Sequence, residues 1–180
     1  RARALLAAAG YAQQRLVLRY KTSADAFRLR LATVLQAQLA AVGIDLVIES
    51  LDWTTFYADI GAGRFELYGL SWVGLAQPDI YRQAFHSASG PPAGLNRGHY
   101  ATPAFDALIE AAEASVDDGR RRELLQAASR RLLDDLPFVP LWFEHQTWVT
   151  GQDIRGYAGD ADGNFDALAM TTRDPARDHD

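Results

Sequence analysis

The first part of the chain shows the hydrophobic spacing of helices. Residues 2–9 are rich in alanine and leucine and end at Gly10, which predicts a short helix closed by a residue that tolerates a left-handed conformation. A second helix is predicted to start after Ser23, which we expect to be its N-cap, and to stop at Gly43. Its expected inward side chains recur at helical spacing at Phe27, Leu31, Val34, Leu35, Leu39 and Val42.

Strands are predicted on either side of that second helix. Residues 16–20 form a short apolar run, and residues 44–50 follow the two-residue period of a strand, with Ile44, Leu46 and Ile48 on one face. A strand, a helix and a strand in this order predict a parallel pair joined by a crossover helix, a connection that is right-handed in about 98% of cases. We therefore expect an α/β layer in which helices cover a sheet.

The second half of the chain continues the alternation. We expect a helix near residues 54–61, a strand over 66–73, a loop-rich passage over 75–101 and another strand over 138–149. Between the last two, one helix begins at Thr102-Pro103, and the next begins at Asp117 and Asp118 and stops at Pro137. The expected inward positions are Phe105, Leu108, Ile109 and Ala112 in the first of these helices and Leu124, Leu125, Ala128 and Leu132 in the second.

Composition excludes several classes of protein. At 180 residues the chain can bury a core, and the absence of cysteine excludes thiolate metal sites and cysteine nucleophiles. The net charge of -5 argues against a nucleic-acid partner, because such a partner needs a basic face. No apolar run reaches the roughly 18 residues that span a bilayer. Since the chain opens inside a helical pattern without an initiator Met or a signal peptide, we expect a fragment of a longer, processed protein.

Candidate binding chemistry gathers between residues 69 and 100. A strand that ends in an aromatic residue and opens into connections rich in Gly, Pro and Asn can present side chains to a ligand. Trp72 and Tyr100 could pack against such a ligand, and Asn96 and Arg97 could hydrogen-bond its polar groups. The alternatives are structural: core packing for Trp72 and a solvated loop position for Arg97.

Metal and enzyme chemistry have weaker signals. His86 and His99 flank a Gly-Pro-Pro loop, but their spacing has no metal-ligand signature, and surface or capping roles explain them better. Residues 69–74 miss the spacing of a nucleophile elbow by one residue and have no placed His and acid partners. The sequence therefore predicts no catalytic residue, no metal and no cofactor, and a hydrolase stays a remote alternative.

A series of short motifs runs through most of residues 2–160. They are residues 5–11 (LLAAAGY), 36–44 (QAQLAAVGI), Asp52-Trp53 with Phe56, 63–67 (GRFEL), Ser71-Trp72, Pro78-Asp79, Asn96 with Tyr100, Pro103 with Phe105-Asp106 and Ala111-Ala112, Arg122 with Leu124, and 136–141 (LPFVPL). In order and spacing, this series resembles the bacterial extracellular solute-binding proteins of family 5. These are the oligopeptide-, dipeptide- and nickel-binding subunits of ABC importers.

The resemblance implies a fold and a set of partners. The expected fold is α/β, a lobe of the periplasmic-binding-protein type II kind with a central mixed sheet covered by helices. Family members have two lobes, close over their ligand by hinge motion and deliver it to a membrane permease. We expect residues 1–153 to form the C-terminal (second) lobe, and residues 154–180 to form a return segment and a mobile tail. The expected partners are the N-terminal lobe, the ABC permease and a peptide or small polar solute.

The resemblance also marks where this chain departs from peptide binders. In those members an aspartate three residues after the tryptophan pairs with the α-amino group of the peptide, and that position is Leu75 here. A leucine cannot accept a charge-assisted hydrogen bond, so amine anchoring by this residue is lost. Gly69 replaces an arginine of some oligopeptide binders, and Gln77 replaces the usual Asp. Asp79 could supply a substitute carboxylate or, alternatively, cap a helix over residues 80–85.

Together these inferences predict a substrate-binding component of an ABC import system, located in the periplasm or outside the cytoplasmic membrane. The expected ligand is a peptide or a similar small polar solute. The alternative, which Leu75 favours, is a non-peptide ligand such as a nickel chelate, haem, a sugar or a hydrophobic solute. The predicted ligand-binding residues are Trp72, Gly74, Leu75, Gln77, Asp79, Asn96, Arg97 and Tyr100.

Overall fold

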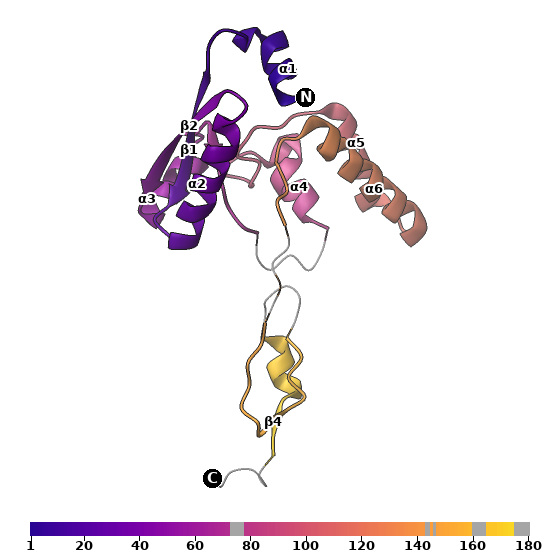
Figure 1. Cartoon of the computed structure of the whole chain (residues 1–180). Coiled ribbons are helices and arrows are strands. Elements are labelled where there is room, and N and C mark those ends of the chain that lie inside the picture. Colours follow the sequence, from indigo (N-terminus) through magenta and orange to yellow (C-terminus); the bar gives the residue numbers. More distant parts are fainter. Residues whose placement is uncertain (73–77, 143–144, 146, 160–164, 175–180) are drawn as a thin grey trace. The chain divides into compact units, whose positions relative to one another are not determined.

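The computed structural model describes residues 1–72, 78–142, 145, 147–159 and 165–174, and the chain divides into two compact units. Unit 1 comprises Arg1–Ser71 and Gln83–Ala101, and unit 2 comprises Trp72–Arg82 and Thr102–Asp180 (Figure 1).

The elements of unit 1 are α1 (Ala2–Leu6), the π-helix η1 (Ala7–Tyr11), β1 (Leu16–Ser23), α2 (Ala26–Ala40), β2 (Ile44–Leu51), α3 (Trp53–Gly61), β3 (Leu67–Tyr68) and the 3-10 helix η2 (Ser87–Ser89). Helix α4 (Ile80–Phe85) contains a boundary of the units, and unit 2 holds α5 (Pro103–Ala114), α6 (Asp118–Asp135), β4 (Ile154–Arg155), the 3-10 helix η3 (Asp166–Met170) and β5 (Thr172–Arg173).

Unit 1 is built on a parallel sheet with the strand order β2-β1-β3. Strand β1 pairs with β2 along its whole length, from Leu16 opposite Ile44 to Ser23 opposite Leu51. It pairs with β3 at Tyr20 and Lys21. The predicted strand–helix–strand unit is therefore confirmed as β1, α2 and β2. The strand predicted over residues 66–73 is shorter than expected, since β3 contains two residues, and Val73 lies outside the described residues.

The core of unit 1 lies between the sheet and α2, which Figure 1 shows across β1 and β2. Its buried members are Tyr20, Ala32 and Leu46, with Leu18, Leu35, Leu39 and Ile48 packed around them. Two members of the predicted stripe are outside it, because Phe27 is 51% exposed and Val34 is 52% exposed. The contact stripe of α2 runs through Ala32, Leu35 and Leu39, and at 3.6 residues per turn positions 27 and 34 lie about a third of a turn from its centre.

The N-cap of α2 is Asp25, and the prediction of Ser23 was wrong. Ser23 is buried as the last residue of β1, where the register with β2 keeps it in the sheet. The carboxylate of Asp25 accepts a hydrogen bond from the Arg28 amide at 3.0 Å. Asp52 caps α3 in the same way through the Thr55 amide, at 3.1 Å. An aspartate at this position satisfies one of the free amides of the first turn.

Helix α3 contacts β1 and buries Phe56 and Ile60 completely. Lys21 of β1 alternates with the core residue Tyr20, so it projects from the opposite face of the sheet. Its ammonium pairs with Asp59 of α3 at 2.5 Å. Helices α2 and α3 therefore cover opposite faces of β1.

Unit 2 contains the pair of helices α5 and α6, which pack against each other. Helix α5 buries Phe105, Ile109 and Ala112, as predicted, while α6 buries Leu124 and Ala128. The other expected inward positions, Leu108, Leu125 and Leu132, are half-buried.

The caps of these two helices differ. Asp117 caps α6 by accepting from the Arg120 amide at 2.6 Å, which confirms its predicted place at the positive end of the helix. Thr102 occupies the N-cap position of α5, but its hydroxyl makes no capping hydrogen bond. Pro103 stands at the start of α5, where it lacks one of the amides that a cap would satisfy.

The end of the described chain contains a small antiparallel pair in place of the predicted strand. Among the described residues of 138–149 none is in a strand, and Val139, Leu141 and Trp142 are exposed. Strands β4 and β5 pair instead, with Ile154 opposite Arg173. The expected division at residue 153 and the mobile tail stay predictions.

Candidate functional site

The predicted ligand-binding residues fall in both units. Trp72 and Asp79 belong to unit 2, and Asn96, Arg97 and Tyr100 belong to unit 1. The other three, Gly74, Leu75 and Gln77, lie outside the described residues. Trp72 is half-buried, and Asp79 is exposed directly before α4. Both alternatives for Asp79, a substitute carboxylate and a cap, stay predictions.

Asn96 holds the loop of unit 1 together. Its side chain is 2% exposed, and its Nδ2 donates to the backbone carbonyls of His86 at 3.1 Å and Tyr100 at 2.7 Å. Its Oδ1 accepts from the Tyr100 amide at 2.9 Å. Three hydrogen bonds from one amide close the chain between residues 86 and 100. A ligand contact by Asn96 stays a prediction, and its observed partners are backbone groups.

The backbone of this loop adds further ties. The Leu95 amide donates to the Gln83 carbonyl at 2.9 Å, and the Asn96 amide donates to the Ser89 carbonyl at 2.9 Å. Gly94 lies so close to the Ser89 backbone that any side chain there would collide with it. The His86 Nδ1 accepts from the Ala88 amide at 3.1 Å, so this histidine has the capping role that the sequence favoured.

Arg97 is a buried cation that packs on an aromatic ring. The residue is 5% exposed, and its Nη2 donates to the Tyr57 hydroxyl at 2.9 Å. The Arg97 Cζ lies 5.0 Å from the centroid of the Tyr57 ring. Tyr57 in turn stacks on Trp53 of the same helix, with ring centroids 5.6 Å apart. A guanidinium over an aromatic face is a favourable cation–π geometry, and it links the loop to α3.

Tyr68 of β3 is also beside this guanidinium. Burial raises the pKa of the Tyr68 hydroxyl, and Arg97 lowers it in part through a hydrogen bond and its charge. Arg97 has no carboxylate partner among the described residues, and its Nη1 is buried without a partner that meets hydrogen-bond geometry there. A buried cation of this kind could accept an anion, since unpaired charge in a protein interior costs several kcal/mol.

The structure gives a physical reason for the glycine at position 69. A side chain there would collide with the Tyr20 hydroxyl, so the arginine of some oligopeptide binders has no room at this place. Burial raises the pKa of Tyr20, and the nearby charge of Arg28 opposes that rise. The Arg28 Nη1 donates to the Gly69 carbonyl at 3.4 Å. The Arg28 guanidinium of α2 therefore lies beside position 69, where it binds the backbone.

Metal chemistry gains no support from the described residues. They contain no group of three or more His, Asp or Glu side chains placed to hold a metal ion. In the same part of the chain, no helix combines the length and apolarity needed to cross a membrane.

Sequence reasoning missed the tyrosines around Arg97. Tyr57 and Tyr68 come from α3 and β3, and no motif in the sequence links either of them to position 97. The alternation of β1 does place Tyr20 inward, so its position could have been inferred. Its contact with Gly69 could not, because that contact depends on how β1 and β3 pair.

Solved structures with the same fold cover nearly the whole chain. A periplasmic binding protein DppA from Helicobacter pylori, in complex with the peptide STSA, has a TM-score of 0.73 and 25% identity over 96% of this chain and 34% of its own. OppA from Haemophilus influenzae, in complex with RPPGFSPFR, has a TM-score of 0.77 and 21% identity over 95% of this chain and 34% of its own. The fold is that of a type II periplasmic-binding-protein lobe, as predicted.

Sequence comparison gives the family. The family model described as "Bacterial extracellular solute-binding proteins, family 5 Middle" matches residues 1–91. Di/tripeptide-binding protein 4 of Pseudomonas aeruginosa (strain UCBPP-PA14) is 32% identical over 161 residues, which is 87% of this chain and 30% of that protein. The chain belongs to family 5 of the bacterial extracellular solute-binding proteins, and it spans about a third of the length of these relatives.

Proposed function

We propose that this chain is part of the substrate-binding component of an ABC import system. The complete protein captures a peptide or a similar small polar solute outside the cytoplasmic membrane, in the periplasm or its equivalent, and delivers it to the permease. The chain acts as a binding lobe and performs no chemistry on the ligand. The N-terminal lobe of the same protein supplies the other wall of the binding cleft.

The observation that carries this proposal is the combination of family and fold. The family match over residues 1–91 is joined by structural likeness over 96% of the chain to a protein crystallised with a peptide. A hinged receptor needs two walls to enclose a ligand, and one lobe buries too little ligand surface to repay the cost of ordering it. The proposal therefore concerns the full-length protein.

The ligand contacts in this proposal are the predicted residues. Trp72 and Tyr100 pack on the apolar parts of the ligand, and Asp79, Asn96, Gln77 and Arg97 meet its polar groups. Gly74 and Leu75 also contact the ligand. For Arg97 the lack of a carboxylate partner among the described residues supports a role toward a ligand anion. Its bond to Tyr57 supports a structural role as well.

A second candidate is a non-peptide ligand of the same kind of receptor. The sequence observation that favours it is Leu75, which stands where peptide binders of the family carry the amine-binding aspartate. Without that carboxylate, the ammonium of a peptide would be desolvated with no partner from this residue. A nickel chelate, haem, a sugar or a hydrophobic solute makes no such demand.

Calorimetry of the full-length protein separates the two candidates. Di-, tri- and oligopeptides are titrated beside their N-acetylated forms, metal chelates, haem and sugars. Saturable heat with peptides supports the first candidate. Saturable heat with only a chelate, haem or a sugar moves the proposal to the second, and silence from every class would contradict the binding function.

A variant pair tests the role of position 75. Leu75→Asp should restore amine anchoring and favour the free peptide over its acetylated form by about 10-fold, the equivalent of roughly 1.4 kcal/mol. Leu75→Asn is the matched control, because it has nearly the same shape without the charge. Equal gains in both variants would show that the position does not meet the amine.

A further inference from the structure

Unit 2 has a hollow whose described lining contains none of Trp72, Asp79, Asn96, Arg97 and Tyr100, the predicted ligand-binding residues that the structure describes. Its volume is about 410 Å³, and its walls come from the start of α4, with Pro78 before it, and from the first two thirds of α6. Sites for small molecules in proteins measure roughly 300 to 1,000 Å³. The hollow is therefore large enough for a small organic ligand.

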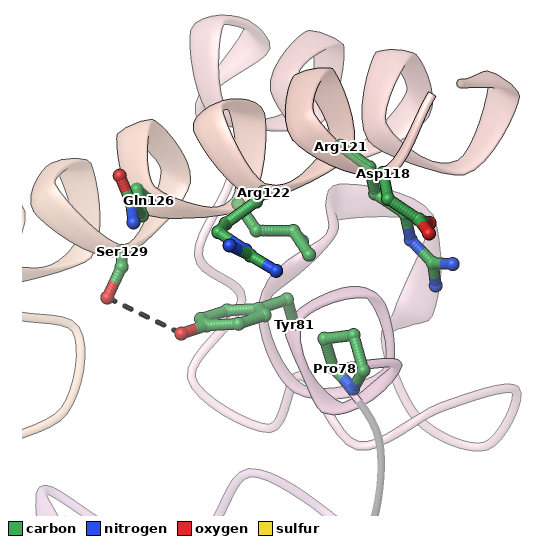
Figure 2. A pocket seen from close by; sticks show the side chains of 8 residues that line it. Pro78, Tyr81, Asp118, Arg121, Arg122, Gln126 and Ser129 are labelled. Carbon is green, nitrogen blue, oxygen red and sulfur yellow. Dashed lines mark hydrogen bonds between the residues drawn. The ribbon is translucent and has the colours of Figure 1, made fainter. Parts of the chain in front are cut away.

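One wall of the hollow is apolar. The rings of Pro78 and Tyr81 and the side chain of Leu125 line it. The Tyr81 hydroxyl donates to the Ser129 Oγ at 3.4 Å, which holds the ring against α6 (Figure 2). An aromatic ring fixed at its polar end presents a flat surface at little cost in side-chain entropy.

The other wall is cationic. Arg121 and Arg122 both line the hollow, and Figure 2 shows Arg122 reaching from α6 toward Tyr81. Neither guanidinium has a hydrogen-bond or ion-pair partner among the described residues. Among the described lining residues Asp118 is the one acidic side chain, so the described lining carries two cations and one anion. This local excess of positive charge contrasts with the net charge of -5 for the whole chain.

Neighbouring arginines of the same helix behave differently. Arg120 pairs with Glu123 at 3.1 Å, and Arg131 pairs with Asp135 at 2.7 Å. The two arginines of the hollow have no acidic residue at such a spacing that pairs with them. Gln126 and Ser129 add an amide and a hydroxyl to the same lining. Planar guanidinium groups bind oxyanions through paired N–H donors, so the open donors here match a carboxylate or phosphate group.

We propose that this hollow binds a small organic oxyanion, with its charged group on Arg121 and Arg122 and its apolar body on Tyr81, Pro78 and Leu125. The proposal does not rest on the proposed function, because the described lining of the hollow shares no residue with the ligand contacts proposed above. The shared chemistry is an oxyanion attached to an apolar body, and either a carboxylate or a phosphate can supply the charge.

Nuclear magnetic resonance on the whole 15N-labelled chain tests the proposal. Benzoate, phenyl phosphate, benzamide and inorganic phosphate are titrated in turn, and the signals of Gln126 and Ser129 are followed. We expect saturable shifts with benzoate or phenyl phosphate, and the stronger of the two identifies the charged group. Benzamide, which lacks the charge, should bind at least 10-fold more weakly. Inorganic phosphate, which lacks the apolar body, should also bind at least 10-fold more weakly.

Substitutions locate the binding and control for net charge. Arg121→Gln and Arg122→Gln should each weaken binding of the better probe by about 10-fold, since each removes a charge-assisted contact. Arg130→Gln changes the charge of the same helix by the same amount at an exposed position outside the hollow, and it should stay within 2-fold. Binding of solute by the full-length protein should be unchanged in all three variants.

Several results would overturn the proposal. These are the absence of saturable shifts at Gln126 and Ser129, equal binding of benzamide, equal binding of inorganic phosphate, and an equal loss in Arg130→Gln. The fold of each variant is checked by its amide spectrum, so that a loss of binding is not confused with unfolding.

Discussion

The arginine of unit 1 and the arginines of unit 2 lie in opposite surroundings. Arg97 is 5% exposed and rests on Tyr57, with its Nη2 bonded to the hydroxyl of that ring. Arg121 and Arg122 are exposed and reach into an open hollow beside Tyr81. An arginine and a tyrosine therefore form a buried contact in unit 1, whereas in unit 2 arginines and a tyrosine line an open hollow.

The difference shows what burial does to a cation. In unit 1 the phenol groups of Tyr57 and Tyr68 replace most of the hydration of the guanidinium, so removing one of these partners leaves a charge with poor solvation. In unit 2 water can solvate both guanidinium groups, so they lose little without a partner and stay available to a ligand. Stability should therefore respond to changes around Arg97, and binding should respond to changes at Arg121 and Arg122.

The largest effects should come from the cores of the two units. Phe56 of α3 and Phe105 of α5 are both fully buried. Phe56→Ala and Phe105→Ala should each lower the free energy of unfolding by about 4 kcal/mol, because each deletes a ring and leaves a cavity. Hydrogen exchange resolved by residue would show whether each loss is confined to its own unit. Equal loss of protection in both units would show that they unfold as one.

Asn96→Ala should have the next largest effect. The change leaves the carbonyls of His86 and Tyr100 and the amide of Tyr100 without their side-chain partners. We expect a loss of about 3 kcal/mol in the free energy of unfolding by urea, since each stranded buried polar group costs roughly 1 to 3 kcal/mol. Gln38→Ala, at an exposed position of α2, is the control and should stay within about 0.5 kcal/mol. A similar loss in both variants would contradict the role of Asn96 in holding the loop together.

Tyr57→Phe tests the hydrogen bond between Tyr57 and Arg97 with a smaller change. The ring and the cation–π contact are kept, and only the acceptor for the Arg97 Nη2 is lost. Because hydrogen bonds to charged groups contribute roughly 1.5 to 3 kcal/mol, we expect a loss of about 2 kcal/mol by urea unfolding. Tyr81→Phe removes a hydroxyl from the open hollow of unit 2 and should cost less than half as much. The reverse order would end the contrast between the two arginine environments.

Asp117→Ala should have a modest effect on α6. The carboxylate accepts from the Arg120 amide at 2.6 Å, and loss of an N-cap costs about 1 kcal/mol. Asp118→Ala is the control, since Asp118 belongs to the first turn and is not the cap. Thermal unfolding of the two variants measures the difference, and equal shifts in Tm would contradict the capping role.

The smallest effect should be a dependence of stability on acidic pH that comes from the Asp59 carboxyl. Lys21 first, and then Arg64, lower the pKa of the Asp59 carboxyl from its ordinary value of 3.8. A lowered pKa in the folded state gives stability that is present above pH 4 and is lost as the pH falls through the folded pKa. Lys21→Met should raise the pKa of Asp59 more than Arg64→Gln does, measured by titration of its side-chain carbon signal. Titration of Asp59 at the same pH in both variants would contradict this order.

Local pattern was enough for much of the fold. The alternation of residues 44–50 and the apolar spacing of α5 gave β2 and the buried positions of α5, because each depends on neighbours one turn or two residues away. The same reasoning failed for the described residues of 138–149, none of which is in a strand, since a strand exists only where another strand pairs with it. It also failed for Phe27 and Val34, because the rotation of α2 about its own axis, which turns Ala32 toward the sheet, selects the buried stripe.

The candidate site was predictable in its residue types and not in its contacts. Motifs singled out Asn96 and Arg97, but nothing in the sequence indicated that the Asn96 amide would bind backbone groups or that Arg97 would lie on Tyr57. The unpaired arginines of α6 are visible in the sequence as an ordinary basic run, and only the approach of Tyr81 makes them part of a hollow.

By itself, the sequence determined the family, the α/β class and the order of the main helices and strands as far as α6, since these follow from motifs and from periodicities that act over a few residues. The tertiary structure decided which polar groups are enclosed and which stay open. Enclosure depends on contacts between residues such as Tyr57 and Arg97, 40 positions apart, and the energy of a charge changes with its solvation far more than with its neighbours in the chain.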